Sequence, residues 1–518
     1  MAAVAPAATP GPRKLRVGLF APARLQPRWV VEAFAKVAAS DFAEIALISM
    51  AMGAKSPSNA SWLWKAYGAL DRRLFRAGDP DALLDLARHV RHRKITGAEA
   101  NPDRFVELDL DVAFALGDFD DTALDGVARY GVWRFQADGA REVVEGAPLT
   151  GSALQVRLEP GAEPKLAYQS WSRTCLFSVA RNRGELLAKT SEFAWRALRE
   201  AHRSGFAWLE QCKSLARGEG ELGLRPRIFP VLRSAAARAL ERTLQREQWF
   251  IAWKKSGDGP IAPDLAGFTR IVPPPDRTWA DPFAVEKDAR RFVFFEELPF
   301  SAGKAHISVI EIGRDGCWSP PARVLERDHH LSYPFVFEHE DALYMIPETA
   351  QAGTVELYRC EEFPLRWRRE KILIEGVRLA DATLHRGAER WWMFANGAAG
   401  SSRVFDDELH IFYSESLLGE WRPHARNPVK SDARCTRPAG RLYWRGGALY
   451  RPAQICAPAY GAGLSINRVL RLTPHEYAER QVERVLPDHA RGLLGLHTLN
   501  CAGELTVVDA LTRRRRFA

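Results

Sequence analysis

A repeated pattern in the second half of the chain constrains the fold more than any other feature. Five times, a polar residue or a tyrosine stands directly before a short apolar strand. A turn and a second apolar strand with a polar end then follow. Successive repeats start roughly 50 residues apart, a period typical of one blade of a β-propeller. The repeats start at Asp281, Tyr333, Asp381, Arg437 and His497.

Three repeats also carry the sequence of an outer strand pair. In each, a strand-like segment leads through a turn to a tryptophan. These tryptophans are Trp318, Trp367 and Trp421. Four strands in about 50 residues make one blade, so we predict an all-β five-bladed propeller over residues 251–518.

The first half of the chain alternates between apolar strands and helices. Residues 15–21, 44–50 and 111–117 are short apolar runs typical of buried parallel strands, and segments with helical spacing lie between them. This alternation predicts an α/β, Rossmann-like domain over residues 14–204.

Two further segments differ in composition from both domains. Residues 205–250 contain a stretch rich in Gly, Arg and Pro and then a helical stretch, which predicts a linker that carries a helix. The Ala/Pro-rich residues 1–13 are predicted to be a disordered tail.

Charge, cysteine usage and hydropathy give expectations about partners and location. A net charge of +9 over 518 residues is mild and identifies no partner by itself. We expect no nucleic-acid partner, and we expect the basic run Arg513–Arg516 to be a solvated tail rather than a nucleic-acid or lipid site. The seven cysteines are scattered without metal-ligand spacing, and the first residues lack the pattern of a secretion signal. No apolar run reaches the ~18–20 residues of a membrane span. We therefore expect a cytoplasmic protein without a transmembrane segment, and leave its oligomeric state open.

The polar residues of the repeats are candidates for one functional site. Because each begins or ends a strand of an innermost hairpin, period-two alternation turns its side chain toward the central channel. The candidate catalytic residues are Asp281, Glu348 and Asp381, and the candidate substrate-binding residues are Trp279, Tyr333, Arg437, Arg451, Gln454, His497 and Asn500. Each has a structural alternative, such as a turn cap, a solvated strand end or an ion pair.

Two or three carboxylates around one cavity are the groups that glycosidases use to cleave a glycosidic bond. One protonates the leaving oxygen, and the other activates water or attacks the anomeric carbon. Aromatic residues such as Trp279 and Tyr333 could stack on a sugar ring. No cofactor or metal is expected, and His497 is the one candidate for a channel metal.

Residues ~250–510 resemble the domain on the N-terminal side of the plant glucosamine inositolphosphorylceramide transferases, which also occurs in many bacterial proteins. The chain is thereby identified as a bacterial relative of that domain. The resemblance rests on Trp279-Ala-Asp-Pro-Phe, Ser332-Tyr-Pro-Phe-Val-Phe, Ile346-Pro-Glu-Thr, Ala380-Asp-Ala-Thr-Leu, Arg437-Pro-Ala-Gly, Tyr450-Arg-Pro-Ala-Gln and Leu496-His-Thr-Leu-Asn.

More distantly, the same domain is similar to five-bladed propeller glycosidases. That similarity implies that Asp281 is the base or nucleophile, that Glu348 is the acid, and that Asp381 tunes the acid. The roles of Glu348 and Asp381 could be exchanged.

Residues ~14–200 resemble the formyltransferase fold in strand and helix order and in Tyr130-Gly-Val-Trp-Arg-Phe. Formyl transfer in that family needs an Asn, a His and an Asp. At the expected place this sequence has Arg134-Phe-Gln-Ala-Asp, without the histidine, so the resemblance implies a degenerate domain.

Three functions follow as hypotheses. The first is a propeller glycoside hydrolase or transglycosylase with paired carboxylates, linked to cell-surface polysaccharide or glycolipid metabolism and acting on a carbohydrate. The second is a non-catalytic protein that binds glycans or assists assembly in polysaccharide biosynthesis. The third, a sugar formyltransferase, is disfavoured by the missing histidine.

Overall fold

The computed structural model describes residues 13–50, 62–75, 79–96, 105, 107–214, 228–255, 265–398 and 404–516. Apart from Arg13, the predicted tail lies outside these residues, as does part of the predicted linker. The chain divides into two compact units, one formed mainly by residues before 233 and one mainly by residues after it. No helix in the described ranges has the length and apolar character to cross a membrane.

The first unit is built on one seven-stranded mixed sheet. Its first five strands are parallel where their pairing is given, and β8 runs antiparallel to β7. The order across the sheet is β5 (His92–Thr96), β3 (Ala43–Ser49), β1 (Leu15–Phe20), β6 (Val112–Ala115), β7 (Val132–Gln136), β8 (Leu149–Arg157) and β9 (Lys165–Arg173). This confirms an α/β domain, while the formyltransferase-like assignment stays a prediction.

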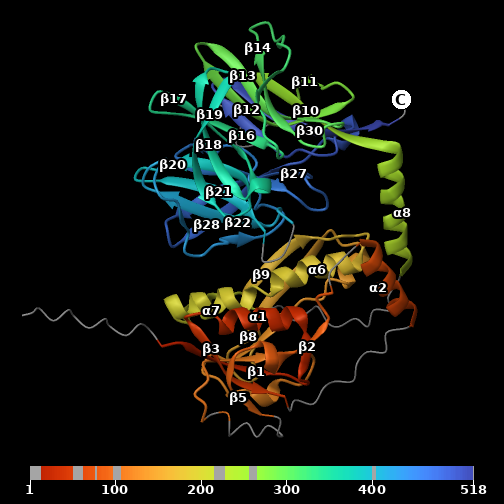
Figure 1. Ribbon diagram of the computed structural model, residues 1–518, viewed down its shortest axis with the longest axis vertical. Coiled ribbons are helices and arrows are strands. Elements are labelled where there is room, and N and C mark those ends of the chain that lie inside the picture. Colours follow the sequence, from red (N-terminus) through yellow and green to blue (C-terminus); the bar gives the residue numbers. More distant parts are fainter. Residues whose placement is uncertain are drawn as a thin grey trace, which may run out of the picture. The chain divides into compact units, whose positions relative to one another are not determined.

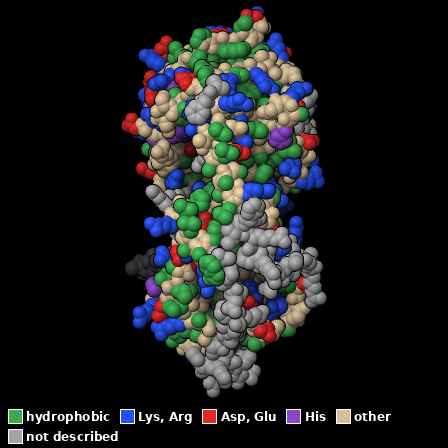
Figure 2. All heavy atoms as spheres, turned by 90° about the vertical axis from the view of Figure 1, so that its right-hand side faces the viewer, with side chains coloured by type: hydrophobic (Ala, Val, Ile, Leu, Met, Phe, Trp, Pro, Cys, Tyr) green, Lys and Arg blue, Asp and Glu red, His purple; other side chains and the backbone are tan. Residues whose placement is uncertain are grey.

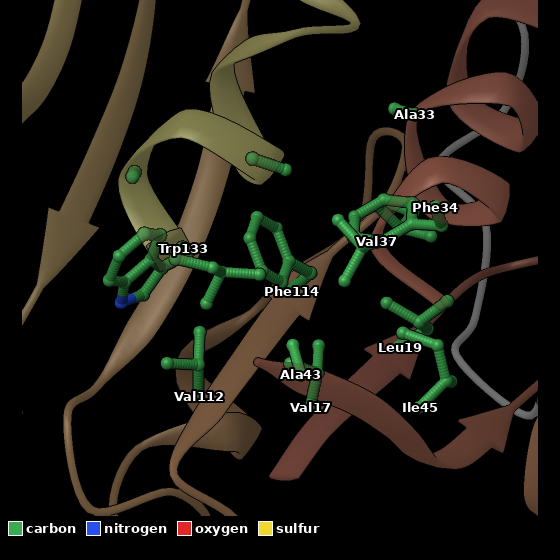
Figure 3. Packing of buried hydrophobic residues seen from close by; sticks show 14 of the residues in the cluster. Val17, Leu19, Ala33, Phe34, Val37, Ala43, Ile45, Val112, Phe114 and Trp133 are labelled. Carbon is green, nitrogen blue, oxygen red and sulfur yellow. The ribbon is translucent and has the colours of Figure 1, made fainter. Parts of the chain in front are cut away.

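Helices cover this sheet and close its core. Phe34 and Val37 of α1 point toward Leu19, Phe114 and other apolar side chains of the central strands (Figure 3). The helices are α1 (Arg28–Ala38), α2 (Trp62–Phe75), α3 (Leu86–His89), α5 (Arg141–Glu145), α6 (Val179–Thr190) and α7 (Phe193–Ser204), and a short ribbon joins β2 (Leu25–Pro27) to β4 (Leu83–Asp85).

The second unit is a five-bladed propeller, as predicted, because its strands form five sheets with four-stranded order. The first strands of four blades are in contact, the first with the second, the second with the third and the fifth with the first, which marks the inner edge of these blades. The first three blades are β12 (Arg277–Lys287), β13 (Arg290–Pro299), β14 (His306–Ile312) and β15 (Ala322–Leu325); β16 (Ser332–His339), β17 (Ala342–Glu348), β18 (Thr354–Glu362) and β19 (Arg366–Glu375); and β20 (Leu379–Arg386), β21 (Trp391–Gly397), β22 (Glu408–Ser414) and β23 (Arg422–Pro423), with β24 (Lys430–Ser431) also on β22.

The last two blades complete the ring. They consist of β25 (Tyr443–Arg445), β26 (Ala448–Ile455), β27 (Gly463–Leu472) and β28 (Tyr477–Val485), and of β29 (Leu499–Ala502), β30 (Leu505–Arg515), β10 (Gln245–Lys255) and β11 (Thr269–Ile271).

Charged side chains of both signs are interspersed on the face shown in Figure 2, so the net positive charge is not gathered into one field there.

The fifth blade is made from both ends of the propeller segment. The repeat that starts at His497 supplies its inner pair, and β10 and β11 supply the outer pair. β10 and β30 lie side by side in antiparallel register from Gln245–Arg515 to Lys255–Leu505 (Figure 1). The strand β10, which follows helix α8 (Ile228–Leu244), thus begins inside the segment predicted as a linker.

The residues that start the first three repeats sit at β-bulges, which differs from the regular alternation that the sequence predicted. The pairing register shifts at this position in β12, β16 and β20. The backbone there is left-handed, which is uncommon for residues other than glycine and costs about 1–3 kcal/mol each. The φ angles are 51° at Asp281, 45° at Tyr333 and 55° at Asp381. A bulge re-aims a side chain that alternation would send elsewhere.

Weakening the closure of the ring is expected to destabilise the propeller. Ile251 of β10 is fully buried in a cluster with Trp253 and Val507, so Ile251→Ala should lower the free energy of unfolding by about 2–5 kcal/mol. Lys255→Ala, at an exposed position of the same strand, should change it by less than about 0.5 kcal/mol. Urea unfolding followed by tryptophan fluorescence tests this, and equal shifts of the midpoint for both variants would contradict it.

The first unit is expected not to transfer formyl groups. Gln136 ends β7, is exposed, and accepts a hydrogen bond at 2.5 Å from the amide of Gln155. Gln136→His would restore an imidazole but neither of the other two residues that the resemblance requires. Mass spectrometry of amino sugars incubated with formyl-tetrahydrofolate should show no formylated product with the wild type or the variant. A formylated product from either protein would refute this expectation.

Candidate functional site

Asp281 lies at the inner edge of the first blade, where protein donors surround its carboxylate. The Tyr333 N–H of the second blade donates to Oδ2 at 3.2 Å, and the Thr498 hydroxyl of the fifth blade donates to Oδ1 at 2.7 Å. Only 4% of Asp281 is exposed. One carboxylate thus contacts the blades on both sides of its own.

His497 lies between two carboxylates at the same edge. Its Nδ1 is 2.5 Å from Asp509 Oδ2, and its Nε2 is 3.4 Å from Asp281 Oδ1. Although burial opposes it, the attraction of Asp509 and Asp281 raises the pKa of His497 to about 9. Burial raises the pKa of Asp281 to about 8, against the attraction of His497 and with a contribution from Glu296. The ring is therefore an imidazolium at neutral pH, and Trp249 stacks on it at 4.0 Å between centroids.

Asp381 is held in an ion pair with Arg437. Arg437 Nε lies 2.6 Å from Asp381 Oδ2, and the amide of Gln454 donates to the same oxygen at 3.1 Å. The guanidinium also reaches Glu348, with Nη2 3.7 Å from Oε2. It lies over the ring of Tyr460, 5.0 Å from its centroid. One guanidinium therefore joins the carboxyl groups of the second and third blades.

Glu348 is the candidate acid that solvent reaches most readily. Its side chain is 17% exposed, against 1% for Asp381, and it accepts a hydrogen bond from Ser332 at 3.2 Å. Burial, with a contribution from Asp381, raises the pKa of Glu348 to about 7, while Arg437 and His330 oppose the rise. A carboxyl group that titrates near neutrality can hold a proton and also release it, as a general acid must.

Tyr333 and Asn500 bridge blades within the wall of the channel. The Tyr333 hydroxyl lies 2.8 Å from that of Thr383 and accepts from the Gly440 N–H at 2.7 Å. The Asn500 amide donates to the Pro282 carbonyl at 2.8 Å and accepts from the Arg441 N–H at 2.9 Å. Both side chains are buried, so their observed contacts are structural.

Two of the sequence-predicted residues do not join this group. Trp279 packs in an apolar cluster with Phe295, and its indole N–H donates to Glu297 at 3.3 Å. Arg451 is fully buried and paired with Glu479 at 2.8 Å. The prediction that Arg451 helps to close the ring of site residues is therefore wrong, because a buried glutamate on the outer strand β28 engages its guanidinium.

Four residues of this region were not among the predicted site residues. His330 lies 3.2 Å from Glu296, and both are partly exposed near Glu348. The charge of Glu296 raises the pKa of His330, against the effect of burial. Tyr460 contacts Arg437 and His497, and Asp509 holds His497. Glu296 and Asp509 stand at polar ends of second hairpin strands, which is a usable signal, whereas His330 and Tyr460 lie in loops outside the repeat.

Asp281, His497 and Asp509 also form a group that could hold a metal ion, since one ligand atom from each lies within 4.8 Å of the others. The contacts of these residues suit a proton on the His497 ring better than a metal ion. The Asp281, His497 and Thr498 N–H groups all donate to Asp509 at 2.9 Å, and both nitrogens of the His497 ring face carboxylates. A metal would have to displace the proton that these contacts stabilise.

The sequence is similar to one described family. The family model for the N-terminal region of glucosamine inositolphosphorylceramide transferase 1 matches residues 260–498, which confirms the resemblance expected for the propeller. The rice (Oryza sativa subsp. japonica) protein of that name is 36% identical over 221 residues, which are 42% of this chain and 30% of the rice protein. The Arabidopsis thaliana protein is 32% identical over 221 residues, 42% of this chain and 29% of that protein. The chain thus matches less than a third of the length of either relative.

Some solved structures are similar to part of this chain, with low TM-scores. The catalytic domain of a Coprinopsis cinerea GH62 α-L-arabinofuranosidase aligns with a TM-score of 0.36 and 11% identity, over 50% of this chain and 97% of that one. A family 117 glycoside hydrolase of Zobellia galactanivorans aligns with a TM-score of 0.34 and 9% identity, over 51% and 90%. Because these TM-scores are low, the propeller assignment rests on the order of strands in the sheets.

The raised pKa of Glu348 predicts a pH-dependent cost to stability. The folded state holds this proton up to about pH 7, whereas the unfolded chain releases it near 4.5, so stability is lost as pH rises through this window. Glu348→Gln, which mimics the protonated form, should be nearly neutral at pH 4 and stabilising by up to about 3 kcal/mol at pH 8.

Glu297→Gln provides a control of opposite sign. Hydrogen bonds from His306, Ser308 and Arg277 overcome burial and lower the pKa of Glu297 to about 2. This variant should be destabilised at pH 7, by an amount that fades as pH falls from about 4.5 toward 2. Urea unfolding across pH measures both effects, and a Glu348→Gln difference that is flat from pH 4 to 8 would contradict the raised pKa.

Proposed function

We propose that the protein acts on glycans, as a propeller glycoside hydrolase or transglycosylase that uses carboxyl groups at one edge of the propeller channel. The observation that carries this proposal is Glu348, a partly exposed carboxyl group with a pKa near 7 beside a charged guanidinium. Proton donation to a leaving oxygen requires such a group, and a second carboxyl group is needed for the anomeric carbon or for water.

Glu348 is the proposed proton donor, and Asp381 is the residue proposed to tune the pKa of Glu348. The exchange of these two roles is disfavoured because Asp381 is 1% exposed and paired with Arg437. Asp281 is the proposed base or nucleophile. Its two oxygens accept hydrogen bonds from Thr498 and Tyr333, which favour the ionised form, whereas burial raises its pKa to about 8. The role of base or nucleophile therefore uses the ionised form of Asp281, which is the minor form at pH 7.

The named relatives support a link to glycolipid or cell-surface glycan metabolism. They are called glucosamine inositolphosphorylceramide transferases, and the family model that matches covers the segment that carries Asp281, Glu348 and Asp381. Since the match covers under a third of those proteins, their transfer activity stays outside the proposal, and a carbohydrate is the substrate class proposed here.

A glycan-binding protein without catalysis is the second candidate. It is favoured by the burial of Asp281 and by the neutralisation of Asp381, because a binding wall needs hydrogen-bonded, fixed carboxylates rather than reactive ones. In that case Arg437 and Glu348 would contact sugar hydroxyls, and the raised pKa of Glu348 would be a consequence of burial and of the charge on Asp381, without a catalytic role.

Substitution of the two proposed reacting groups distinguishes these candidates. On a glycan or aryl glycoside found by screening, Glu348→Gln and Asp281→Asn should each lower kcat by a factor on the order of 10² or more. Glu338→Gln is the matched control, since Glu338 is exposed in β16 and pairs with Leu343 toward the other end of the same hairpin.

The result is read together with binding of the same glycan. Loss of turnover with retained binding supports catalysis. Full activity in a correctly folded Asp281→Asn protein would exclude the proposed base, and binding without turnover in the wild type would favour the second candidate.

A further inference from the structure

A basic cavity lies in the propeller where β10 and β30 pair, beside the first blade. Its volume is about 340 Å³. Four of its lining residues are arginines, and no acidic residue lines it. The lining consists of Arg246, Gln248, Pro275, Phe300, Arg514, Arg515 and Arg516.

The strand register places two of these arginines against each other. Arg246 and Arg514 are directly paired across β10 and β30, an arrangement in which like charges destabilise a sheet. Within the described part of the chain, no carboxylate forms an ion pair with either of them. Arg513, one residue earlier and so on the other face, is paired with Glu241 at 3.3 Å and with Glu247 at 3.5 Å. The face toward the cavity therefore lacks the negative charge that the opposite face has.

Two neighbouring side chains give the cavity a fixed shape. The Arg246 guanidinium lies over the ring of Phe300, 4.4 Å from its centroid, which orients its donors. Gln248 is 1% exposed, and its amide nitrogen donates to the Pro274 and Arg277 carbonyls at 2.8 and 2.7 Å. These two bonds fix the orientation of the amide, and its Oε1 is buried without a partner among the described residues. A buried acceptor of this kind requires a donor such as a hydroxyl group.

We propose that this cavity binds the phosphate ester of a polyhydroxylated molecule. The arginines would engage the phosphate oxygens, which they can do in bidentate fashion, and a ligand hydroxyl would donate to Gln248 Oε1. Such a ligand removes the repulsion between Arg246 and Arg514 and satisfies the unpaired amide oxygen. The site is separate from the carboxyl groups around Glu348, so this inference does not depend on the proposed glycan activity.

The phosphate can come from a soluble sugar phosphate or from a lipid headgroup, and two arms of one experiment separate these sources. Calorimetry measures binding of glucose 6-phosphate, inorganic phosphate and glucose to the full chain. Flotation measures binding to phosphatidylcholine vesicles with and without phosphatidylinositol. We expect glucose 6-phosphate or the phosphatidylinositol vesicles to bind, inorganic phosphate to bind more weakly, and glucose to show no binding.

Paired variants test whether the cavity is responsible. Arg246→Gln combined with Arg514→Gln should weaken binding about tenfold or more, because two charge-assisted contacts are lost. The matched control is Arg468→Gln combined with Arg480→Gln, since these arginines are also directly paired across two strands, are exposed, and do not line the cavity. The control should bind like the wild type.

Thermal unfolding at low salt gives a second readout that needs no ligand. Removal of Arg246 and Arg514 should raise the Tm of the unliganded protein, and glucose 6-phosphate should raise the Tm of the wild type but not of this variant. Absence of binding to every phosphate-bearing probe, or an equal loss of binding in the control, would overturn the proposal.

Discussion

The site depends on the pairing of β10 with β30, which closes the ring of blades. Asp509 lies in β30 opposite Ile251, and it accepts the N–H groups of Asp281, His497 and Thr498. It also pairs with the His497 imidazolium, which faces Asp281. Closure of the fold and placement of the first candidate carboxylate are thus the same set of contacts, so a propeller that opens at this seam would also lose the geometry around Asp281.

Local strain at three equivalent positions builds the rest of the inner edge. The left-handed backbone at Asp281, Tyr333 and Asp381 is energetically unfavourable for each residue, and contacts between blades hold it. The Tyr333 N–H donates to Asp281, while Arg437 and Gln454 of the fourth blade hold Asp381. The same left-handed backbone thus recurs at the equivalent position of three blades, each time at a residue that contacts a neighbouring blade.

Much of the architecture could be predicted from the sequence because a blade is a local unit with a fixed period. The repeat starts and the outer tryptophans were sufficient for five blades, and the starts marked Asp281 and Asp381. The completion of the fifth blade by β10 could not be predicted, since that pairing joins segments more than 200 residues apart and a single strand has no repeat of its own.

It was harder to predict which side chains belong to the site, because distant partners, a β-bulge and loops decide where they point. Arg451 occupies a register that suits the channel, but Glu479 on a distant strand offers a buried partner. Trp279 lies only two residues before Asp281, but the β-bulge at Asp281 turns the two side chains in different directions. His330 and Tyr460 come from loops, where no periodicity reports the direction of a side chain.

The central claim is that Glu348 is a proton donor poised near neutrality, and a direct titration tests it. In protein labelled with ¹³C at the glutamate carboxyl carbon, one resonance absent from Glu348→Gln should titrate with a pKa near 7. A Glu348 resonance that titrates near the ordinary value of about 4.5 would contradict the account.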